Sequence, residues 1–105
     1  MLIAPYQHTG ELEMLPPATM QEMMLFIGKG IRALRQTMNP QGFNMGANLG
    51  RVAGAGVEDH VHFHLVPRWN GDTNFMPVLG DTKVVSEDMR RTYKKLRKAF
   101  RNATF

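Results

Sequence analysis

Three of the four histidines stand on alternate positions of one short stretch, "HVHFHLV", at 60–66. Side chains alternate between the two faces of a β-strand, and neighbours on one face lie about 6.5 to 7 Å apart. We therefore expect one strand, ending at Pro67, with a row of imidazoles on one face and an apolar row facing the core. The imidazole row is His60, His62 and His64. The apolar row is Val61, Phe63 and Leu65.

Two kinds of site use such a row. Alternate histidines on a strand can chelate zinc, with Glu58 or Asp59 completing the ligand set. Alternatively, one imidazole attacks a phosphorus atom, because an unperturbed pKa of about 6.5 leaves it largely neutral and nucleophilic at pH 7. Its neighbours can then protonate the leaving group or bind the equatorial phosphate oxygens.

A glycine-rich segment before the histidines favours the phosphate site. Five glycines lie between positions 42 and 56. Glycines let backbone amides approach an anion closely, and a zinc site has no need of such a loop. A tight turn would also use glycines, so the loop is weak evidence by itself. We expect no tightly bound metal at the histidines and no cofactor.

The composition is that of a folded globular protein. The chain of 105 residues has the length of one domain, 1–105, with 43% hydrophobic and 21% charged residues. The apolar start is interrupted at Pro5, too early for a signal sequence or a membrane span, so we expect a cytoplasmic protein. There are no cysteines, which excludes disulfides and thiolate metal sites.

The net charge of +4 belongs to one segment. Residues 83–101 hold eight of the thirteen Lys and Arg residues and only two acidic ones. Such a segment can contact nucleic acid electrostatically. No aromatic or glycine-rich RNA motif accompanies it, so we expect a solvated helix face and neither a nucleic-acid nor a membrane partner.

The surrounding pattern predicts a long helix after the first strand. Thr19 and Glu22 form a capping box, and apolar residues follow at spacings of three and four. Gly28 and Gly30 each weaken this helix by about 1 kcal/mol relative to Ala, which favours close packing there. The apolar stripe is Met23, Phe26, Ile27, Ile31, Leu34 and Met38.

Three shorter elements complete the predicted arrangement. Residues 1–5 read as a strand, 39–42 as a turn, and "FNMGANLG" as a further strand. The segment "SEDMRRTYKKLRKAF" reads as a helix with Ser86 as its N-cap. Its buried stripe would be Met89, Tyr93, Leu96 and Phe100.

With these elements in place, the sequence resembles the histidine triad (HIT) superfamily. "HVHFHLV" matches the pattern His-φ-His-φ-His-φ-φ at every position, where φ is apolar. "APYQH", "NLG" and "AGAG" fit as well, and the match covers about residues 2–85. "PRWNGDTNFMPV" resembles the branch of the fragile histidine triad protein and the bacterial dinucleoside polyphosphate hydrolases and phosphorylases.

The resemblance implies an α+β fold with an antiparallel sheet, a long helix and a C-terminal basic helix, paired into a homodimer that binds nucleotides. By analogy, His62 attacks the α-phosphate of a substrate such as diadenosine tetraphosphate and forms a nucleotidyl-histidine, which water or phosphate resolves. His64 would hold phosphate oxygens or assist the leaving group. His60 would orient His62, and His8 would join a proton relay.

Further residues are expected to bind the nucleotide. Asn48 matches an asparagine of the family that contacts it, and Arg68 can clamp a phosphate. Where many members have Gln followed by Ser or Thr, this chain offers only backbone amides to phosphate. These amides belong to Gly54, Ala55 and Gly56. The alternative function is a nucleotide-binding or scaffold module with little turnover.

Compared with the family, the chain is short at its N-terminal side. Family members have several tens of residues before the part that matches "APYQH", and these supply sheet strands and much of the base and ribose pocket. We therefore expect weak preference among bases. An unpaired sheet edge near "MLIAPY" would invite pairing with another copy.

Overall fold

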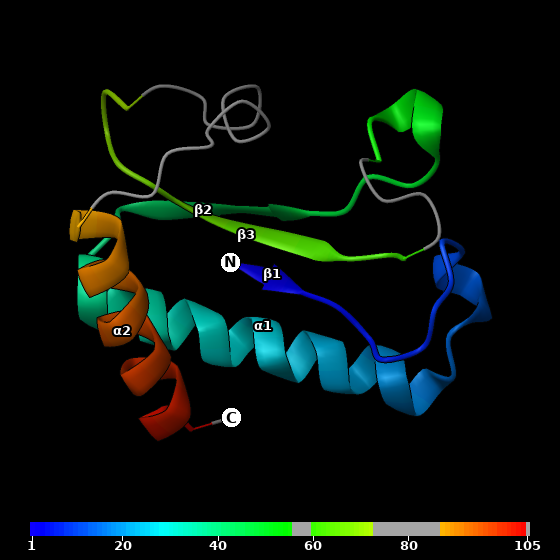
Figure 1. The fold of residues 1–105 in the computed structure, drawn as a ribbon, viewed down its shortest axis with the longest axis horizontal. Helices are drawn as coiled ribbons and strands as arrows, with labels where there is room; N and C mark the ends of the chain where they lie inside the picture. The colour runs from blue at the N-terminus through cyan, green and yellow to red at the C-terminus, as the bar shows by residue number, and fades with distance from the viewer. Residues whose placement is uncertain (56–59, 73–86, 105) are drawn as a thin grey trace.

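The computed structural model describes residues 1–55, 60–72 and 87–104, which form a three-stranded antiparallel sheet with two helices (Figure 1). The strands are ordered β1-β3-β2, so the histidine-bearing strand β3 is central. No helix in this part of the chain is long and apolar enough to cross a membrane. The elements are β1 (Leu2–Ile3), α1 (Pro17–Met38), β2 (Gly42–Gly46), β3 (Phe63–Arg68) and α2 (Glu87–Asn102), with short 3-10 turns at Leu12–Met14 and Arg51–Ala53.

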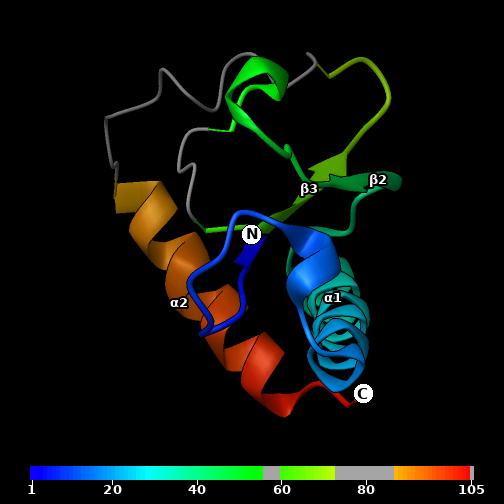
Figure 2. The same cartoon turned by 90° about the vertical axis from the view of Figure 1, so that its right-hand side faces the viewer.

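Helix α1 runs beneath the sheet and closes the core, as the two views show (Figures 1 and 2). Leu34 of α1 and Leu65 of β3 are the largest fully buried side chains. Val61 is buried in a cluster with Leu15 and Met23. The predicted apolar rows on α1 and β3 therefore do form the core.

Strand β3 has different ends from the predicted strand. It begins at Phe63, so His60 and His62 precede it. The ladder with β1 pairs Ile3 with Phe63 and goes no further, because Pro5 has no N–H to donate.

Pro67 does not close β3, as the sequence analysis expected, but lies within it opposite Phe43. Amides alternate sides along a strand, and that of Leu65 points toward β1, where it donates to Met1. The nitrogen of Pro67 therefore points to the same side, beyond the start of β1. Its missing N–H costs no bond in the ladder with β2.

The predicted capping box of α1 is wrong. The helix begins at Pro17, with Pro16 as N-cap and no side-chain cap, so Thr19 already lies within the first turn. Proline is favoured there because its ring fixes a helical φ and the missing N–H would have had no partner. At the other end, Asn39 adopts the left-handed conformation with φ of 48° and ends the helix.

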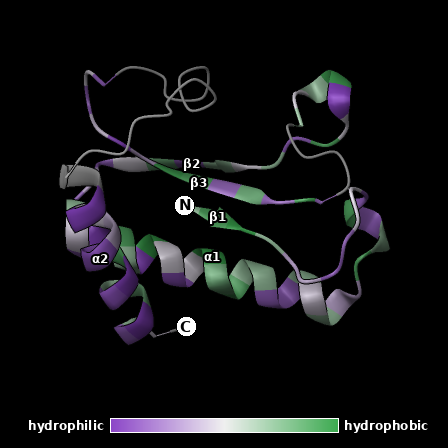
Figure 3. Ribbon diagram, viewed as in Figure 1, coloured by the Kyte–Doolittle hydropathy of each residue, from purple (hydrophilic) through white to green (hydrophobic). Residues whose placement is uncertain are grey.

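Helix α2 packs on α1 through its C-terminal half. Ala99 is buried, and the Phe100 ring stacks on Phe26 with 5.9 Å between centroids. Tyr93, predicted in the buried stripe, is instead 62% exposed, because the contact centres on the small side chain of Ala99. The rest of the helix surface is hydrophilic (Figure 3). The predicted cap Ser86 and the side chain of Met89 lie outside the part that is described.

The close packing predicted near the two helix glycines is found at Gly30. A Cβ there would lie 2.6 Å from Met1 Sδ and 3.2 Å from Leu65 Cδ2, whereas one at Gly28 would meet nothing nearer than 4.0 Å. The end of Met1 can rotate away, but Leu65 is fully buried. Helix α1 can therefore lie this close to β3 only because Gly30 has no side chain.

Substituting the two glycines by alanine should have opposite effects on stability. Gly30→Ala should lower the free energy of unfolding by about 1 to 3 kcal/mol through overpacking. Gly28→Ala, the matched control, should raise it by up to about 1 kcal/mol through helix propensity alone. Urea unfolding followed by circular dichroism measures both. Equal stabilisation by the two substitutions would contradict the close contact.

Candidate functional site

The first two triad histidines are anchored by the segment that follows β1. The His60 Nε2 atom lies 2.6 Å from the carbonyl oxygen of Pro5. The amide of Val61 donates to the carbonyl of Thr9 at 2.7 Å, and the Val61 side chain is 3% exposed. The buried valine and these two bonds fix the backbone on which His60 and His62 stand.

The contacts of His62 assign the protons on its ring. Its Nδ1 atom lies 3.3 Å from the carbonyl oxygen of His60. A carbonyl only accepts hydrogen bonds, so this geometry assigns the hydrogen to Nδ1 and leaves a lone pair on Nε2. Among the described residues, His62 Nε2 has no hydrogen-bond partner. The free nitrogen has the electronic form that a nucleophile requires.

His64 stands on β3 itself, opposite Gly46 of β2. Its Nε2 atom would be 3.4 Å from a Cβ on Gly46, so the ring lies over a strand position without a side chain. Burial lowers the pKa of His64 below its ordinary value, and the charge of His62 adds to this effect. His64 is therefore mainly neutral at pH 7.

His8 comes from the same anchoring segment and meets the triad. Its ring contacts that of His60 edge-on, with 4.7 Å between centroids and 66° between planes. A hollow of about 620 Å³ opens beside it, between Thr9, Glu11 and the loop at Leu49 and Gly50. This volume is within the range of small-molecule sites. The structure thus joins His8 to His60, while its part in proton transfer stays a prediction.

The glycine loop is closed on itself at two of the three amides that were expected to bind phosphate, and the binding of phosphate by this loop stays a prediction. The amide of Gly54 donates to the Arg51 carbonyl at 2.9 Å, and that of Ala55 to the Gly50 carbonyl at 3.2 Å. Gly50 and Gly54 have φ of 85° and 92°, which favours glycine because a Cβ would be strained there.

Asn48 belongs to the same closed loop. Its amide nitrogen donates to the carbonyl of Gly54 at 3.4 Å, and the side chain is exposed. In this arrangement Asn48 supports the loop, and its contact with a nucleotide stays a prediction. Gly56 lies outside the described residues.

Arg68 is not brought to the histidines. It lies four residues along β3 from His64, roughly 13 Å away. Its guanidinium forms two bonds of 2.8 Å to the Asp72 carboxylate and a third to Asn44. The hydrogen bonds from Arg68 and from the Trp69 amide lower the pKa of Asp72 to about 2. Arg68 holds the turn after β3, and its role as a phosphate clamp stays a prediction.

Sequence reasoning missed three residues that shape the site. Pro5 and Thr9 supply the carbonyls that anchor the triad segment, and Gly46 supplies the space for the His64 ring. Of these three, only Pro5 could be recognised from the sequence, because a proline cannot continue the hydrogen-bonded ladder between two strands. The role of Gly46 depends on the register between β2 and β3, which no local pattern specifies.

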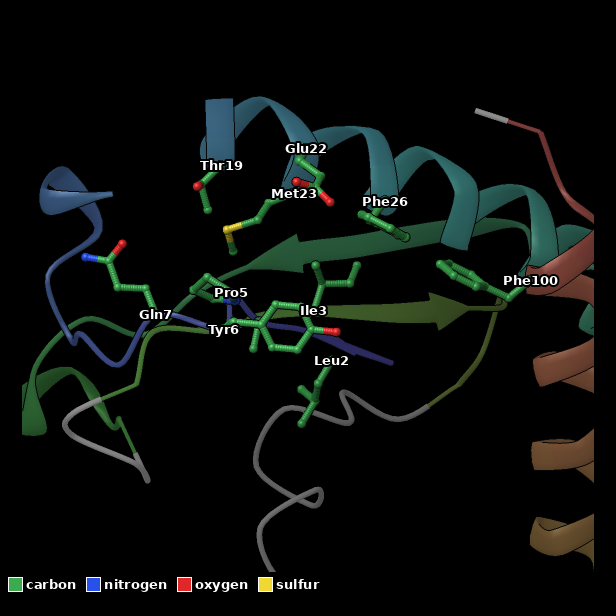
Figure 4. Close-up of a pocket in the computed structure, with 11 residues that line it drawn as sticks. Leu2, Ile3, Pro5, Tyr6, Gln7, Thr19, Glu22, Met23, Phe26 and Phe100 are labelled. Carbon is green, nitrogen blue, oxygen red and sulfur yellow. The ribbon is translucent and has the colours of Figure 1, made fainter. Parts of the chain in front are cut away.

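Two further observations limit what the site can be. Among the described residues, no group of three or more His, Cys, Asp or Glu side chains is arranged to hold a metal ion. Glu58 and Asp59, the predicted partners for zinc, lie outside this part. A separate hollow of about 450 Å³, between β1 and α1, is lined by side chains such as Tyr6, Met23 and Phe26 and by no histidine (Figure 4).

Comparison with protein families and curated proteins agrees with the triad. The family model of the HIT domain matches residues 1–71. The chain belongs to the HIT family. It is 41% identical over 92 residues to a Mycobacterium tuberculosis protein named AP-4-A phosphorylase, which supports the predicted branch. This match covers 88% of the chain but 47% of the relative, so the chain spans about half the length of that protein.

Two other similar proteins extend the comparison. A Candida albicans protein named adenosine 5'-monophosphoramidase is 33% identical over 72 residues, covering 65% of this chain and 47% of that protein. The crystal structure of a zinc-bound histidine triad family protein from Mycobacterium smegmatis superposes with a TM-score of 0.73 at 31% identity, covering 95% of this chain and 67% of that one. The predicted α+β HIT fold is confirmed.

The lowered pKa of His64 predicts a pH dependence of stability. Because the folded pKa lies below the unfolded value of about 6.5, the unfolded state takes up protons first as the pH falls through that value. His64 should therefore reduce stability below about pH 6.5 and not above it. In urea unfolding, the free energy of unfolding of His64→Asn should fall less between pH 7.5 and 5.5 than that of the unsubstituted chain. An NMR titration midpoint for His64 at or above its value in urea would contradict this.

Proposed function

We propose that the chain processes nucleotides by attack of His62 Nε2 on the α-phosphate of the substrate. The observation that carries the proposal is the contact of His62 Nδ1 with the His60 carbonyl, which leaves Nε2 with a lone pair. His60 is in turn fixed by Pro5. An oriented imidazole with a free lone pair on one ring nitrogen can act as a nucleophile.

The reaction has two displacement steps. In the first, a bond forms between His62 Nε2 and phosphorus while the bond to the leaving-group oxygen breaks, and the charge on His62 is balanced by its Nδ1 hydrogen bond to His60. His64, neutral on the same sheet, donates a hydrogen bond from its ring N–H to a phosphate oxygen. In the second, water or inorganic phosphate attacks phosphorus and releases His62 with its lone pair restored.

The substrate we favour is a dinucleoside polyphosphate such as diadenosine tetraphosphate. The support is the 41% identity with a protein named AP-4-A phosphorylase. The relative named adenosine 5'-monophosphoramidase supports attack at an α-phosphate with a different leaving group. Product analysis with and without inorganic phosphate distinguishes the acceptors, because ADP formed only with phosphate means phosphorolysis.

A second candidate is a nucleotide-binding or scaffold module with little turnover. The observation that favours it is the closed glycine loop, in which the amides of Gly54 and Ala55 already have partners within the chain. Such a loop offers fewer donors to the phosphate oxygens, where charge accumulates during transfer. Binding of nucleotide without product would support this alternative.

A covalent adduct is the expected result of incubation with diadenosine tetraphosphate. Rapid quenching and peptide mass spectrometry should find adenylylation at His62. His62→Asn should abolish the adduct and the product, because asparagine keeps a donor near the Nδ1 position but has no nucleophilic nitrogen. His8→Asn is the matched control, in which the adduct at His62 should still form.

Two results would reject this assignment. An adduct on another histidine would show that that histidine, and not His62, is the nucleophile. Near-stoichiometric zinc in the purified protein, removed together with activity by a chelator, would show a metal site, because a coordinated His62 has no lone pair for attack.

The proposed homodimer fits the free edge of β2 better than the predicted edge at β1. Both are outer strands of the sheet. Two large apolar side chains are half exposed, Met45 of β2 at 49% and Met24 of α1 at 45%. Arg35, which lies near the same flank of α1, covers the Phe43 ring of β2. Pairing two β2 edges about a two-fold axis would continue the sheet and bury these methionines.

Adjacent substitutions on α1 test the position of this interface. Met24→Lys should shift the molar mass measured by light scattering from dimer to monomer, because it places a charge on the buried flank. Leu25→Lys should leave the dimer intact, since Leu25 is equally exposed, at 46%, but points about 100° away around the helix. A monomeric unsubstituted chain, or dissociation by Leu25→Lys alone, would contradict the interface.

A further inference from the structure

The outward side of α2 is a dense cationic surface. All its basic side chains from position 90 onward are exposed. The acidic residues of α2 are Glu87 and Asp88 in its first turn, and none follows between positions 90 and 105. The cationic surface consists of Arg90, Arg91, Lys94, Lys95, Arg97, Lys98 and Arg101.

Helix geometry arranges this cationic surface in rows. Positions 90, 94, 97 and 101 follow one another at spacings of four, three and four, so they form one line, and 91, 95 and 98 form a second. Along the axis the first line extends over roughly 17 Å and the second over roughly 10 Å. The opposite side of α2 is held against α1 by Ala99 and by the stack of Phe100 on Phe26. The first row therefore lies on the side of α2 opposite Ala99, and the second row lies next to it around the helix.

An exposed aromatic ring stands beside the first row. Tyr93 is 62% exposed and lies one turn from both Arg90 and Arg97. Tyr93 and Arg97 also border a hollow of about 350 Å³ between α2 and β1, with Leu2 and Phe100 on its walls. Leu2 is itself 68% exposed. A flat apolar group placed here would meet an aromatic ring and apolar walls, with a guanidinium at the rim.

We propose that this face binds single-stranded nucleic acid, with phosphates along the cationic rows of α2 and a base stacked at Tyr93 over the hollow beside β1. Single-strand binding sites combine a positive track for the backbone with aromatic rings on which bases stack. The sequence analysis argued against nucleic acid because no aromatic or glycine-rich RNA motif accompanies the basic helix, and it assigned Tyr93 to the buried stripe. The exposure of Tyr93 removes that objection.

Other partners match fewer of these features. An anionic membrane surface would be favoured by several exposed apolar side chains interleaved with the cations, whereas among the described side chains of α2 Tyr93 is the exposed large apolar one. An acidic peptide would satisfy the charges and leave the aromatic hollow without a role. A duplex keeps its bases stacked inside and cannot offer one to Tyr93. The surface is remote from the triad in sequence and is independent of the proposed catalysis.

Fluorescence anisotropy with labelled 12-nucleotide oligo-uridine and oligo-thymidine tests the proposal on the full chain. Binding should weaken steeply between 50 and 200 mM salt, about in proportion to the phosphates contacted. Tyr93→Ala should weaken it roughly fivefold or more, whereas Tyr93→Phe should retain it because the stacking ring remains.

Charge variants distinguish binding by the cationic surface of α2 from binding through the net charge of the whole chain. Lys94→Gln combined with Lys98→Gln should reduce the slope of log affinity against log salt by about 1.4, at about 0.7 for each lost contact with a single strand. Arg35→Gln on α1 removes a charge elsewhere and should leave the slope unchanged. Turnover of a mononucleotide substrate should be the same in all these variants.

Several outcomes would overturn the inference. Equal affinity of Tyr93→Ala and the unsubstituted chain would show a purely electrostatic surface. Capture by phosphatidylserine vesicles that oligo-uridine does not compete away would assign the surface to membranes. A change of molar mass on Tyr93→Ala would show that another copy covers the hollow.

Discussion

The site depends on one hydrogen bond between a ring nitrogen of His60 and the carbonyl of Pro5. Because proline cannot donate an amide hydrogen, the ladder between β1 and β3 ends there, and the chain of the triad separates from the sheet. The freed carbonyl then accepts from His60 instead of from a strand. A local interruption of the sheet thus becomes the anchor of the histidine row.

The fixed position of His60 determines the orientation of the next histidine in the row. With His60 fixed, its carbonyl is directed at His62 Nδ1, and the tautomer of His62 follows from that contact. His64 remains in the regular sheet, where Gly46 leaves space and burial keeps the ring neutral. The three histidines are therefore chemically different although their sequence spacing is uniform. Displacement at phosphorus uses three such different groups: a nucleophile, a neighbour that orients it and a hydrogen-bonding group.

Much of this arrangement could be predicted from the sequence. The alternation of histidines with Val61, Phe63 and Leu65 identified the buried row, and the family pattern identified the fold. Three features depended on contacts that the sequence patterns do not specify. The strand limits depended on the register with β1 and β2, the closed glycine loop on hydrogen bonds inside residues 50–55, and the exposure of Tyr93 on the way α2 packs on α1.

The central claim is that the contact with His60 holds His62 as the Nδ1-protonated tautomer, with Nε2 free to attack. Long-range proton–nitrogen NMR correlation spectra of the histidine rings at pH 7.5 measure this most directly. We predict that His62 shows a protonated Nδ1 and an unprotonated Nε2, while His60 shows a protonated Nε2 bound to Pro5. A His62 ring protonated at Nε2, or one with the nitrogen shifts of a metal ligand, would contradict the account.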